Sequence, residues 1–363
     1  YLFQPAGGSR RPASHETVDA REHFIHMNGN EVFKFAIQIM GKTAKRALAK
    51  AGFKNVYIVP QQEKPDGNFT TVGYPNPENK AVFDLAMELA KKVDADIIVG
   101  TDPDADRVGA VVKKTDGEYM VLTGNMTGAL LCEYILSQKK AAGTLPENGA
   151  VVSTIVSTDM TKAICAEYGM KYFDVLTGFK YIGEKIKEFE TDGSYEYMFG
   201  FEESYGYLAG PYVRDKDAII GSMLICEMAA YYRAKGSSIK EELERIYAEY
   251  GRYLNKVDSF EFPGLSGMDK MVGIMSGLRE NPPKDFGGDA VVKVVDYKKP
   301  EETGLPAANV LIYTLASGCT VVVRPSGTEP KIKVYLSAVG ESEAAADAVN
   351  AALAEAAAAM MKV

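Results

Sequence analysis

The sequence predicts an α/β protein in which successive α/β domains are followed by a smaller α+β domain at the C-terminus. Two observations lead to this fold class. Over residues 51–256, short apolar runs rich in β-branched residues alternate with longer segments of helical periodicity. From residue 257 onward, strand-like runs follow one another, and an Ala-rich helical segment over 341–362 ends the chain. The first pattern is typical of α/β domains and the second of α+β domains.

The chain has 363 residues, of which 46% are hydrophobic and 25% charged, so it can bury sizeable cores. This length predicts roughly two or three domains. The net charge of -8 and the isoelectric point near 5.2 argue against a partner that is bound by neutralising its phosphates. No basic tract is present, and we therefore expect no nucleic-acid partner.

Neither a disulfide framework nor a membrane span is expected. The four cysteines lie far apart and form no Cys-x-x-Cys pair, which favours small buried thiols in a reducing compartment. No apolar run reaches membrane-spanning length, and no signal peptide is visible, so we expect a cytoplasmic protein with no membrane partner. All three histidines fall within the first thirty residues, so proton transfer elsewhere must use Lys, Asp, Glu or Tyr.

The apolar pattern also places the elements. Strands are expected over 54–60, 95–100, 108–112, 150–156, 171–175, 195–199, 290–295, 310–314, 319–323 and 332–338. Helices are expected over 32–51, 78–93, 125–137, 159–168, 217–234, 238–250 and 341–362, and a further helix opens near 178–183. Strand ends and helix starts are where α/β folds hold anionic ligands, so ligand-binding residues are expected in the loops at these points.

The acidic loop (Thr101–Arg107) joins two expected strands and carries three alternating carboxylates. They belong to Asp102, Asp104 and Asp106. Such close carboxylates repel one another unless a cation lies among them, and their oxygens suit a hard divalent ion such as Mg2+. The alternative is a solvated Asp-Pro turn. A calcium loop of the EF-hand type is excluded, because Arg107 stands where that loop needs Gly and Lys113 where it needs Glu.

Two further loops carry polar side chains at expected strand ends. In the lysine loop (Thr177–Lys180), Lys180 stands near a helix start, where it can face a phosphate; an ordinary surface lysine is the simpler local interpretation. In the glutamate loop (Gly200–Gly206), carboxylates and a hydroxyl lie beside glycine-flanked backbone. A carboxylate can accept hydrogen bonds from two sugar hydroxyls, which suits polyol recognition, and solvated glutamates are the alternative.

The arginine turn (Arg324–Lys331) joins the last two expected strands. It combines an Arg fork, two hydroxyls and backbone amides beside a glycine, and such a turn can hold a phosphate. It is not a Walker loop, because the Gly-Lys-Ser/Thr ending and the following helix are absent. From the residues of this turn alone, a hairpin turn without a ligand is as good an interpretation as a phosphate-binding turn.

Taken together, in this order and at this spacing, the four loops resemble those of the α-D-phosphohexomutase superfamily, and most of all bacterial phosphoglucomutase/phosphomannomutase. The resemblance covers residue 51 to the end. It implies three α/β domains, each of three layers, and a smaller fourth domain around one cleft, with a hexose phosphate as the substrate. The oligomeric state and the preference for glucose or mannose stay open.

The resemblance also implies roles for single residues. The magnesium ligands would be Asp102, Asp104 and Asp106. The catalytic candidates are Arg107, beside the phosphoryl group, and Lys180, as acid or base. The residues that would contact sugar and phosphate are Glu202, Ser204, Thr177, Gly178, Arg324, Ser326, Gly327 and Thr328.

The reaction that the resemblance implies needs a phosphoserine, and this sequence lacks the motif in which the family carries it. The family interconverts hexose 1-phosphate and hexose 6-phosphate through a phosphoserine and a bisphosphate such as glucose 1,6-bisphosphate. The phosphoserine motif Thr-Ala-Ser-His-Asn-Pro is missing, and Ser14 within Pro12–Glu16 lacks the following Asn-Pro. We therefore expect a phosphoglucomutase-type chain that does not turn over by itself; the alternatives are a phosphomannomutase and a non-catalytic sugar-phosphate-binding fragment.

The first 45 residues resemble a different family. Ala6–Glu16 and Met27–Ala36 are similar to an internal segment of the ketoacyl-acyl-carrier-protein synthases, whose catalytic Cys, His and Asn fall outside it. An acyl-transfer enzyme is therefore the weakest alternative. We expect four parts: a foreign-looking lead-in over 1–45, an incomplete α/β metal-binding domain over 46–149, an α/β sugar-binding domain over 150–256, and an α+β phosphate-binding domain over 257–363.

Overall fold

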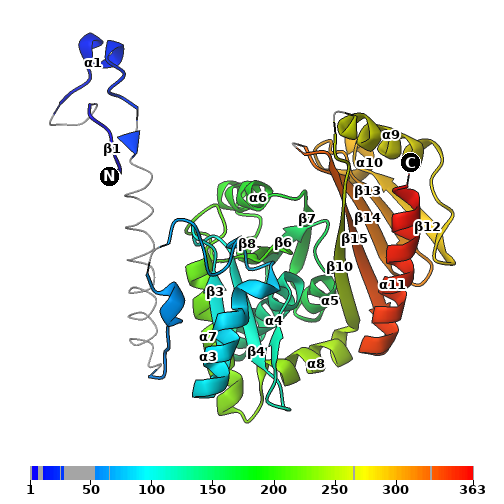
Figure 1. Ribbon diagram of the computed structural model, residues 1–363, viewed down its shortest axis with the longest axis horizontal. Helices are drawn as coiled ribbons and strands as arrows, with labels where there is room; N and C mark the ends of the chain where they lie inside the picture. Colours follow the sequence, from blue (N-terminus) through cyan, green and yellow to red (C-terminus); the bar gives the residue numbers. More distant parts are fainter. Residues whose placement is uncertain are drawn as a thin grey trace.

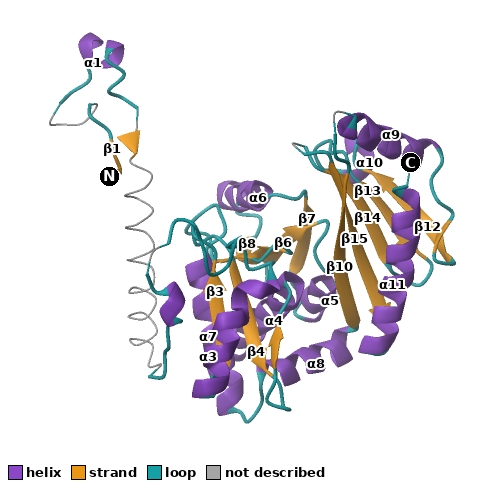
Figure 2. Cartoon of the chain, in the orientation of Figure 1, coloured by secondary structure: helices purple, strands orange, loops and turns teal. Residues whose placement is uncertain are grey.

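The computed structural model describes residues 2–6, 11–24, 26–27, 54–64, 66–264, 266–327 and 329–362. In this part of the chain the strands form four sheets, of two, three, four and six strands. Figures 1 and 2 show the three larger sheets with helices packed against them. The smallest sheet pairs β1 (Leu2–Phe3) with β2 (His26–Met27), near α1 (His15–Asp19). The helix expected over 32–51 lies outside the described residues.

The three-stranded antiparallel sheet carries the acidic loop. Its order is β3 (Ile97–Thr101), β4 (Val108–Lys113) and β5 (Tyr119–Val121). The helices beside it are α3 (Asp84–Val93) and α7 (Ala218–Ala234). Val108 and Gly109 point to opposite faces of the sheet because they are neighbours on one strand. Gly109 lies under the ring of Phe83, just before α3, whereas Val108 lies against Gly221 of α7. Both faces are therefore covered, which gives three layers.

The four-stranded sheet has the order β7-β6-β8-β9, and its first three strands are parallel. The strands are β6 (Gly149–Thr154), β7 (Lys171–Val175), β8 (Glu196–Glu202) and β9 (Gly206–Ala209). The helices are α4 (Gly124–Ala141), α5 (Met160–Glu167), α6 (Phe179–Asp192) and α8 (Ile239–Tyr250). Val151 packs in the core that contains α4, and Val152 in the core that contains α6. Since neighbouring residues of β6 face opposite ways, this sheet too lies between two helical layers.

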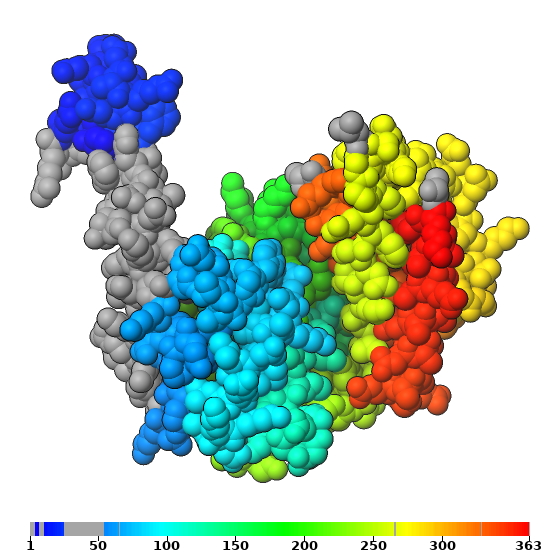
Figure 3. Space-filling model, viewed as in Figure 1, coloured from blue at the N-terminus to red at the C-terminus, as the bar shows by residue number. Residues whose placement is uncertain are grey.

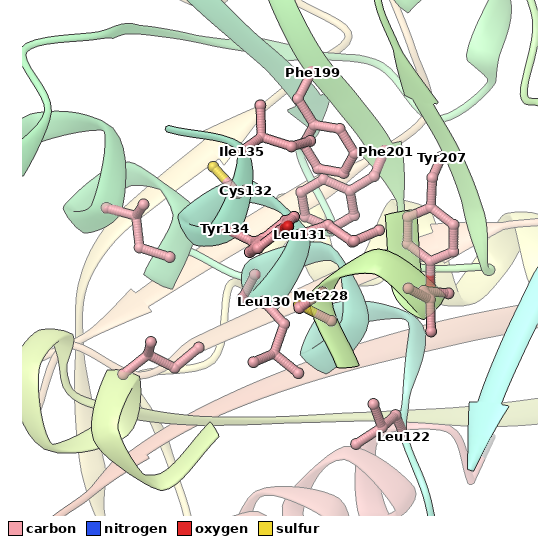
Figure 4. Close-up of a cluster of buried hydrophobic side chains, with 14 of the residues drawn as sticks. Leu122, Leu130, Leu131, Cys132, Tyr134, Ile135, Phe199, Phe201, Tyr207 and Met228 are labelled. Atoms are coloured by element: carbon pink, nitrogen blue, oxygen red, sulfur yellow. The ribbon is translucent and has the colours of Figure 1, made fainter. Parts of the chain in front are cut away.

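Helix α4 is buried over most of its length and links the first two sheets. Figure 4 shows Leu130, Leu131 and Ile135 of this helix beside the aromatic rings of β8 and Met228 of α7. The rings of Phe199 and Phe201 are stacked, with centroids 5.8 Å apart. Fully burying one such aliphatic side chain stabilises a fold by about 1.5–3 kcal/mol, so α4 is a main source of cohesion here.

The six-stranded antiparallel sheet forms the C-terminal unit, on the right of Figure 1. Its strands, in spatial order, are β10 (Arg252–Glu261), β15 (Lys331–Gly340), β14 (Thr320–Pro325), β13 (Leu311–Leu315), β12 (Asp289–Asp296) and β11 (Asp285–Phe286). The helices of this unit are α9 (Gly267–Glu280), α10 (Pro300–Thr303) and α11 (Glu343–Met360). On β14, Val321 and Val323 pack in the core with α9 and α11, whereas Val322 faces the α/β part.

The α/β fold class with a separate C-terminal unit is confirmed, and most expected elements are present within a few residues. One expected strand is wrong: residues 54–59 are not paired with any described strand, and η1 (Pro60–Gln62) follows them. The expected helix over 78–93 starts with a 3-10 turn, η2 (Lys80–Phe83), and becomes α-helical at Asp84. An extended apolar segment becomes part of a sheet only when another strand pairs with it. The pattern of apolar residues in 54–59 does not show whether such a partner strand exists.

Two of the expected domain limits cut through structural units. The limit at 256/257 falls inside β10, which pairs with β15 over its ten residues, so the C-terminal unit begins near Arg252. The limit at 149/150 separates α4 from the sheet on which it packs. Among the described residues, no helix is both long and apolar enough to cross a bilayer.

Candidate active site

The acidic loop closes the hairpin between β3 and β4, in which Thr101 pairs with Val108. Asp102 organises it: its Oδ1 accepts hydrogen bonds from the backbone N–H groups of Asp106, at 3.2 Å, and Arg107, at 3.0 Å. Ala105 adopts a left-handed backbone, with φ of 56°, where the chain turns back. The loop is thus a tight turn that is held by its own first carboxylate.

The carboxylates of the three aspartates of the loop lie close together. One carboxylate oxygen each from Asp102, Asp104 and Asp106 lies within 4.8 Å of the other two. Burial raises the pKa of Asp102 to about 6 against the hydrogen bond from the Arg107 N–H, and the neighbouring aspartates add to the rise. Ionising such a cluster is costly without a cation, and hard oxygen donors are what magnesium prefers. The donor set therefore fits a divalent ion.

Lys216 is a site residue that the sequence interpretation missed. Its Nζ lies 2.8 Å from Asp106 Oδ2, and its side chain is only 13% exposed. Burial acts to raise the pKa of Asp106, but the hydrogen bond from Lys216 brings it below its ordinary value. The lysine stem passes Gly206 so closely that a Cβ there would lie 2.3 Å from Lys216 Cδ. The signal in the sequence was the charged run Arg214–Asp217 directly before α7.

Arg107 lies at the end of the acidic loop and is surrounded by carboxylates. Its Nη1 is 2.9 Å from Glu78 Oε1. Its Nε is 3.9 Å from Asp102 Oδ2 and also 3.9 Å from Asp106 Oδ1. The guanidinium thus places a positive charge next to the carboxylates of the acidic loop.

The glutamate loop packs directly on the acidic loop, although about a hundred residues separate them in the chain. The backbone N–H of Val108 donates to the carbonyl of Tyr205 at 3.0 Å, and Arg107 forms a β-bridge with Gly206. The start of α7 is fixed to the same place, because Ala218 N–H donates to the Ala105 carbonyl at 3.0 Å. Two of the predicted loops are therefore one structural unit.

Glu202 links this unit to the lysine loop. It is 5% exposed, and its Oε1 accepts a hydrogen bond of 2.9 Å from the backbone N–H of Gly178. Burial raises the pKa of Glu202, while the charge of Lys216, this hydrogen bond and the charge of Arg107 oppose the rise. The carboxylate therefore lies within the field of both cations. The second oxygen of Glu202 has no hydrogen bond to a described residue, so it is available to a ligand hydroxyl.

The other members of the two loops are less enclosed. Thr177 Oγ1 is buried and has no hydrogen-bond partner among the described residues. Lys180 is exposed, and its Nζ lies 4.8 Å from the centroid of the Tyr181 ring. Ser204 is half-buried between Glu203 and Tyr205. The structure thus places Gly178 and Glu202 in the cluster and leaves Lys180 at its edge.

The arginine turn connects β14 and β15 in the C-terminal unit. Ser326 N–H donates to the Lys331 carbonyl at 2.8 Å, and Ser326 Oγ accepts from Glu329 N–H at 3.2 Å. Gly327 is exposed, and Thr328 lies outside the described residues. Arg324 is half-buried beside the hydroxyl of Tyr335.

The C-terminal unit meets the α/β part at a packed apolar interface. Its members from the α/β part are Ile155, Val156 and Leu176, and those from the C-terminal unit are Val310, Val322 and Tyr335. Figure 3 shows the two parts adjoining, green and cyan against yellow and orange. A cavity of about 200 Å³ lies along this interface and includes Tyr335, but none of the predicted site residues lines it.

The fold and these contacts define an α/β protein with a carboxylate cluster that fits a divalent ion, a buried glutamate and nearby cations at one sheet edge. Three family models match consecutive parts of the chain. They describe the phosphoglucomutase/phosphomannomutase α/β/α domain II over 27–117, α/β/α domain III over 123–250, and the C-terminal domain over 290–356. The domain II match starts inside the segment 1–45, and α4 falls in domain III, in agreement with its packing.

Curated relatives carry the same family name. A phosphoglucomutase of Staphylococcus aureus is 38% identical over 300 residues, which are 80% of this chain and 53% of that protein. A phosphoglucomutase of Staphylococcus epidermidis is also 38% identical, over 80% of this chain and 54% of that protein. The chain thus spans about half the length of the curated relatives that it matches.

Solved structures share the fold at low sequence identity. A phosphoglucomutase/phosphomannomutase family protein of Burkholderia thailandensis matches with a TM-score of 0.63 and 18% identity, over 90% of this chain and 59% of that one. The open form of the Paramecium phosphoglucomutase parafusin matches with a TM-score of 0.59 and 17% identity, over 83% and 52%. The chain belongs to the α-D-phosphohexomutase superfamily.

Proposed function

We propose that the chain is the metal-, sugar- and phosphate-binding part of a phosphoglucomutase, which moves a phosphoryl group between the 1- and 6-positions of a hexose. The observation that carries this proposal is the direct contact among three loops from distant parts of the chain. The acidic loop packs on the glutamate loop, and Glu202 accepts a hydrogen bond from Gly178 of the lysine loop. Phosphoryl transfer depends on positioning and charge neutralisation, and this cluster provides both.

Each group has a task in this proposal. Magnesium held by Asp102, Asp104 and Asp106 would neutralise charge on the transferring phosphoryl group. Arg107 adds a positive charge there, and Lys216 fixes the Asp106 carboxylate on the same side. Glu202 accepts hydrogen bonds from the hexose hydroxyls, with Ser204 beside it.

The remaining predicted residues act at the edges of the site. Lys180 is the candidate acid or base, and Thr177 and Gly178 line the ligand beside it. Arg324, Ser326, Gly327 and Thr328 hold the phosphate that does not react. In the complete reaction, the intermediate is a bisphosphate, glucose 1,6-bisphosphate. It reorients in the site so that its two phosphates exchange places.

We propose further that this chain binds hexose phosphates without completing turnover. The serine motif of the family does not occur in the sequence. Ser14, the nearest echo of it, caps α1: its Oγ accepts from Thr17 N–H at 3.2 Å. A hydroxyl that satisfies a helix start in this way is explained by its structural role.

Calorimetry tests the proposal. Glucose 6-phosphate titrated into the chain with magnesium should give saturable heat at millimolar ligand, and chelating the metal should weaken the binding. Mannose 6-phosphate in a parallel titration distinguishes the phosphomannomutase alternative. A coupled assay with added glucose 1,6-bisphosphate should show no conversion of glucose 1-phosphate. Absence of heat with both sugars at millimolar concentration refutes the binding function, and measurable conversion refutes the absence of turnover.

A further inference from the structure

Glu203 is a half-buried glutamate to which no motif gives a role. It follows Glu202 at the end of β8, and its side chain takes a different direction. Whereas Glu202 meets Gly178, Glu203 Oε2 accepts a hydrogen bond of 3.2 Å from Thr154 Oγ1 at the end of β6. Thr154 is 1% exposed and is also 2.9 Å from Ser157 Oγ. Glu203 therefore lies in the crevice between the carboxyl ends of two parallel strands.

The backbone of Glu203 is fixed as firmly as its side chain. Glu202 pairs with Gly206, so residues 203–205 are a three-residue connection between β8 and β9. The first residue of α4 lies against this connection: a Cβ at Gly124 would be 1.9 Å from the Glu203 carbonyl oxygen. The carboxylate therefore cannot move far without moving the glutamate loop.

One face of the C-terminal sheet lies over this crevice. Arg324 is directly opposite Lys333 in the β14–β15 register, and Val322 is opposite Tyr335. Opposite residues, and residues two apart on a strand, share a face, so these four side chains lie on one side of the sheet. Val322 and Tyr335 pack against Ile155 at the domain interface, directly after Thr154. Lys333 and Arg324 thus lie on the sheet face that covers this interface, as the next opposed pair on that face after Val322 and Tyr335.

We propose that Glu203 is a positioning residue that couples the C-terminal sheet to the bound hexose phosphate. Lys333 lies beside Arg324 on the sheet face that packs over Ile155, and an ionised Glu203 would attract Lys333 there. This attraction holds the arginine turn against the glutamate loop, so that Arg324 can reach the non-reacting phosphate of a sugar already held by Glu202. The inference rests on the proposed function, which supplies the ligand.

The attraction requires an ionised carboxylate and therefore depends on pH. Burial and the charge of Glu202 raise the pKa of Glu203 to about 7, while the hydrogen bond from Thr154 and the charge of Lys333 oppose the rise. The titratable groups that face it are Glu202 on its own loop and, from the sheet, Lys333 and Tyr335, whose neighbour is Arg324. Between pH 6 and pH 8 Glu203 changes from mostly neutral to mostly charged, and the coupling should strengthen.

The test compares glucose 6-phosphate affinity at pH 6 and pH 8 in the wild type, Glu203→Gln and Glu196→Gln. Glutamine keeps an acceptor for Thr154 but carries no charge, and Glu196 is an exposed glutamate on the same strand. We expect Glu203→Gln to weaken binding roughly fivefold at pH 8 and hardly at pH 6. Glu196→Gln should have the wild-type affinity at both pH 6 and pH 8. The phosphate of the ligand also ionises in this range, and comparison with this control separates that effect from the ionisation of Glu203.

A double-mutant cycle identifies the partner. Lys333→Met should weaken binding at pH 8 as Glu203→Gln does, and the double variant should lose no more than either single variant. Wild-type affinity in Glu203→Gln at pH 8, or additive losses in the double variant, would overturn the inference. Circular dichroism of each variant checks that it is folded.

A measurement without ligand keeps the two proposals separate. If the wild type binds no hexose phosphate at either pH, the proposed function fails, and the pairing is then judged by urea unfolding at pH 8. Coupled shifts of the unfolding midpoint in the same cycle support the Glu203–Lys333 attraction, and strictly additive shifts refute it.

Discussion

Lys216 places a positive charge inside a cluster that, in the proposed function, also holds a divalent cation. Its ammonium group is 2.8 Å from Asp106 Oδ2, and Glu202 lies within its field. A lysine in this position repels the metal but attracts the phosphate of a ligand, so the two partners of the site should respond to it in opposite ways.

Replacing this lysine separates the two effects. Lys216→Met keeps the stem that passes Gly206 and removes only the charge. Magnesium should bind this variant as tightly as the wild type or more tightly, whereas glucose 6-phosphate should bind about tenfold more weakly, because a charge-assisted hydrogen bond is worth roughly 1.5–3 kcal/mol. Calorimetric titration of each ligand measures both. Lys114→Met, in an exposed turn, is the control. Parallel weakening of both ligands would mean that the variant has simply damaged the loop.

Removing a metal donor gives the complementary result. Asp104→Asn takes one charged oxygen from the triad and leaves the hydrogen bonds of Asp102 to the loop backbone in place. Magnesium affinity should fall by roughly tenfold or more, since affinity follows the number of charged ligands. A magnesium titration followed by the melting temperature measures this. Asp116→Asn, in the turn before β5, should leave the magnesium response unchanged; an equal response of Asp104→Asn and the wild type would exclude the triad as the metal site.

At the scale of elements, helix α4 and the glutamate loop constrain each other. Gly124 begins the helix, and its backbone lies so close to the Glu203 carbonyl that no side chain fits between them. The position of the first residue of this helix therefore also restricts the path of the glutamate loop.

A pair of glycine variants tests this constraint. Gly124→Ala should destabilise the protein by about 1–3 kcal/mol through overpacking and should weaken glucose 6-phosphate binding, because the loop must shift. Gly277→Ala, at an open position of α9, should stabilise it by about 0.5–1 kcal/mol. Urea unfolding and calorimetry give the two readouts. Unchanged affinity in a destabilised Gly124→Ala would show that the loop does not depend on the helix start.

Prediction from sequence succeeded for elements and failed for contacts between them. The acidic loop was predictable because two apolar strands flank it and its carboxylates alternate locally. The contact of Lys216 with Asp106 was not, since it depends on how α7 docks against β4. The predicted limit divided strand β10 because this edge strand shows no regular alternation of polar and apolar residues. Residues 54–59 were expected to be a strand because they are rich in apolar residues. A strand also needs a pairing partner, and none of the described strands pairs with this segment.

At the scale of the whole molecule, the predicted site is divided between two units that meet at one interface. The acidic loop and Glu202 belong to the α/β part, and the arginine turn belongs to the C-terminal sheet. Ligand affinity should therefore depend on how firmly these units are held together, whereas metal affinity should not.

Disrupting the interface tests this division. Val322→Lys places a charge where a 4% exposed valine packs against Ile155 and Val156, and burying an unpaired charge is strongly unfavourable, so the units should separate. We expect a larger radius of gyration in solution scattering and at least tenfold weaker glucose 6-phosphate binding. Magnesium affinity should be unchanged, because the contacts that hold the acidic loop all lie within the α/β part. Val292→Lys changes a 63% exposed valine of the same sheet and should alter none of the three quantities.

Two results for Val322→Lys would contradict this division, provided that Val292→Lys behaves like the wild type. A loss of magnesium binding would mean that the acidic loop also depends on the C-terminal unit. Full hexose phosphate affinity would mean that the arginine turn does not take part in binding.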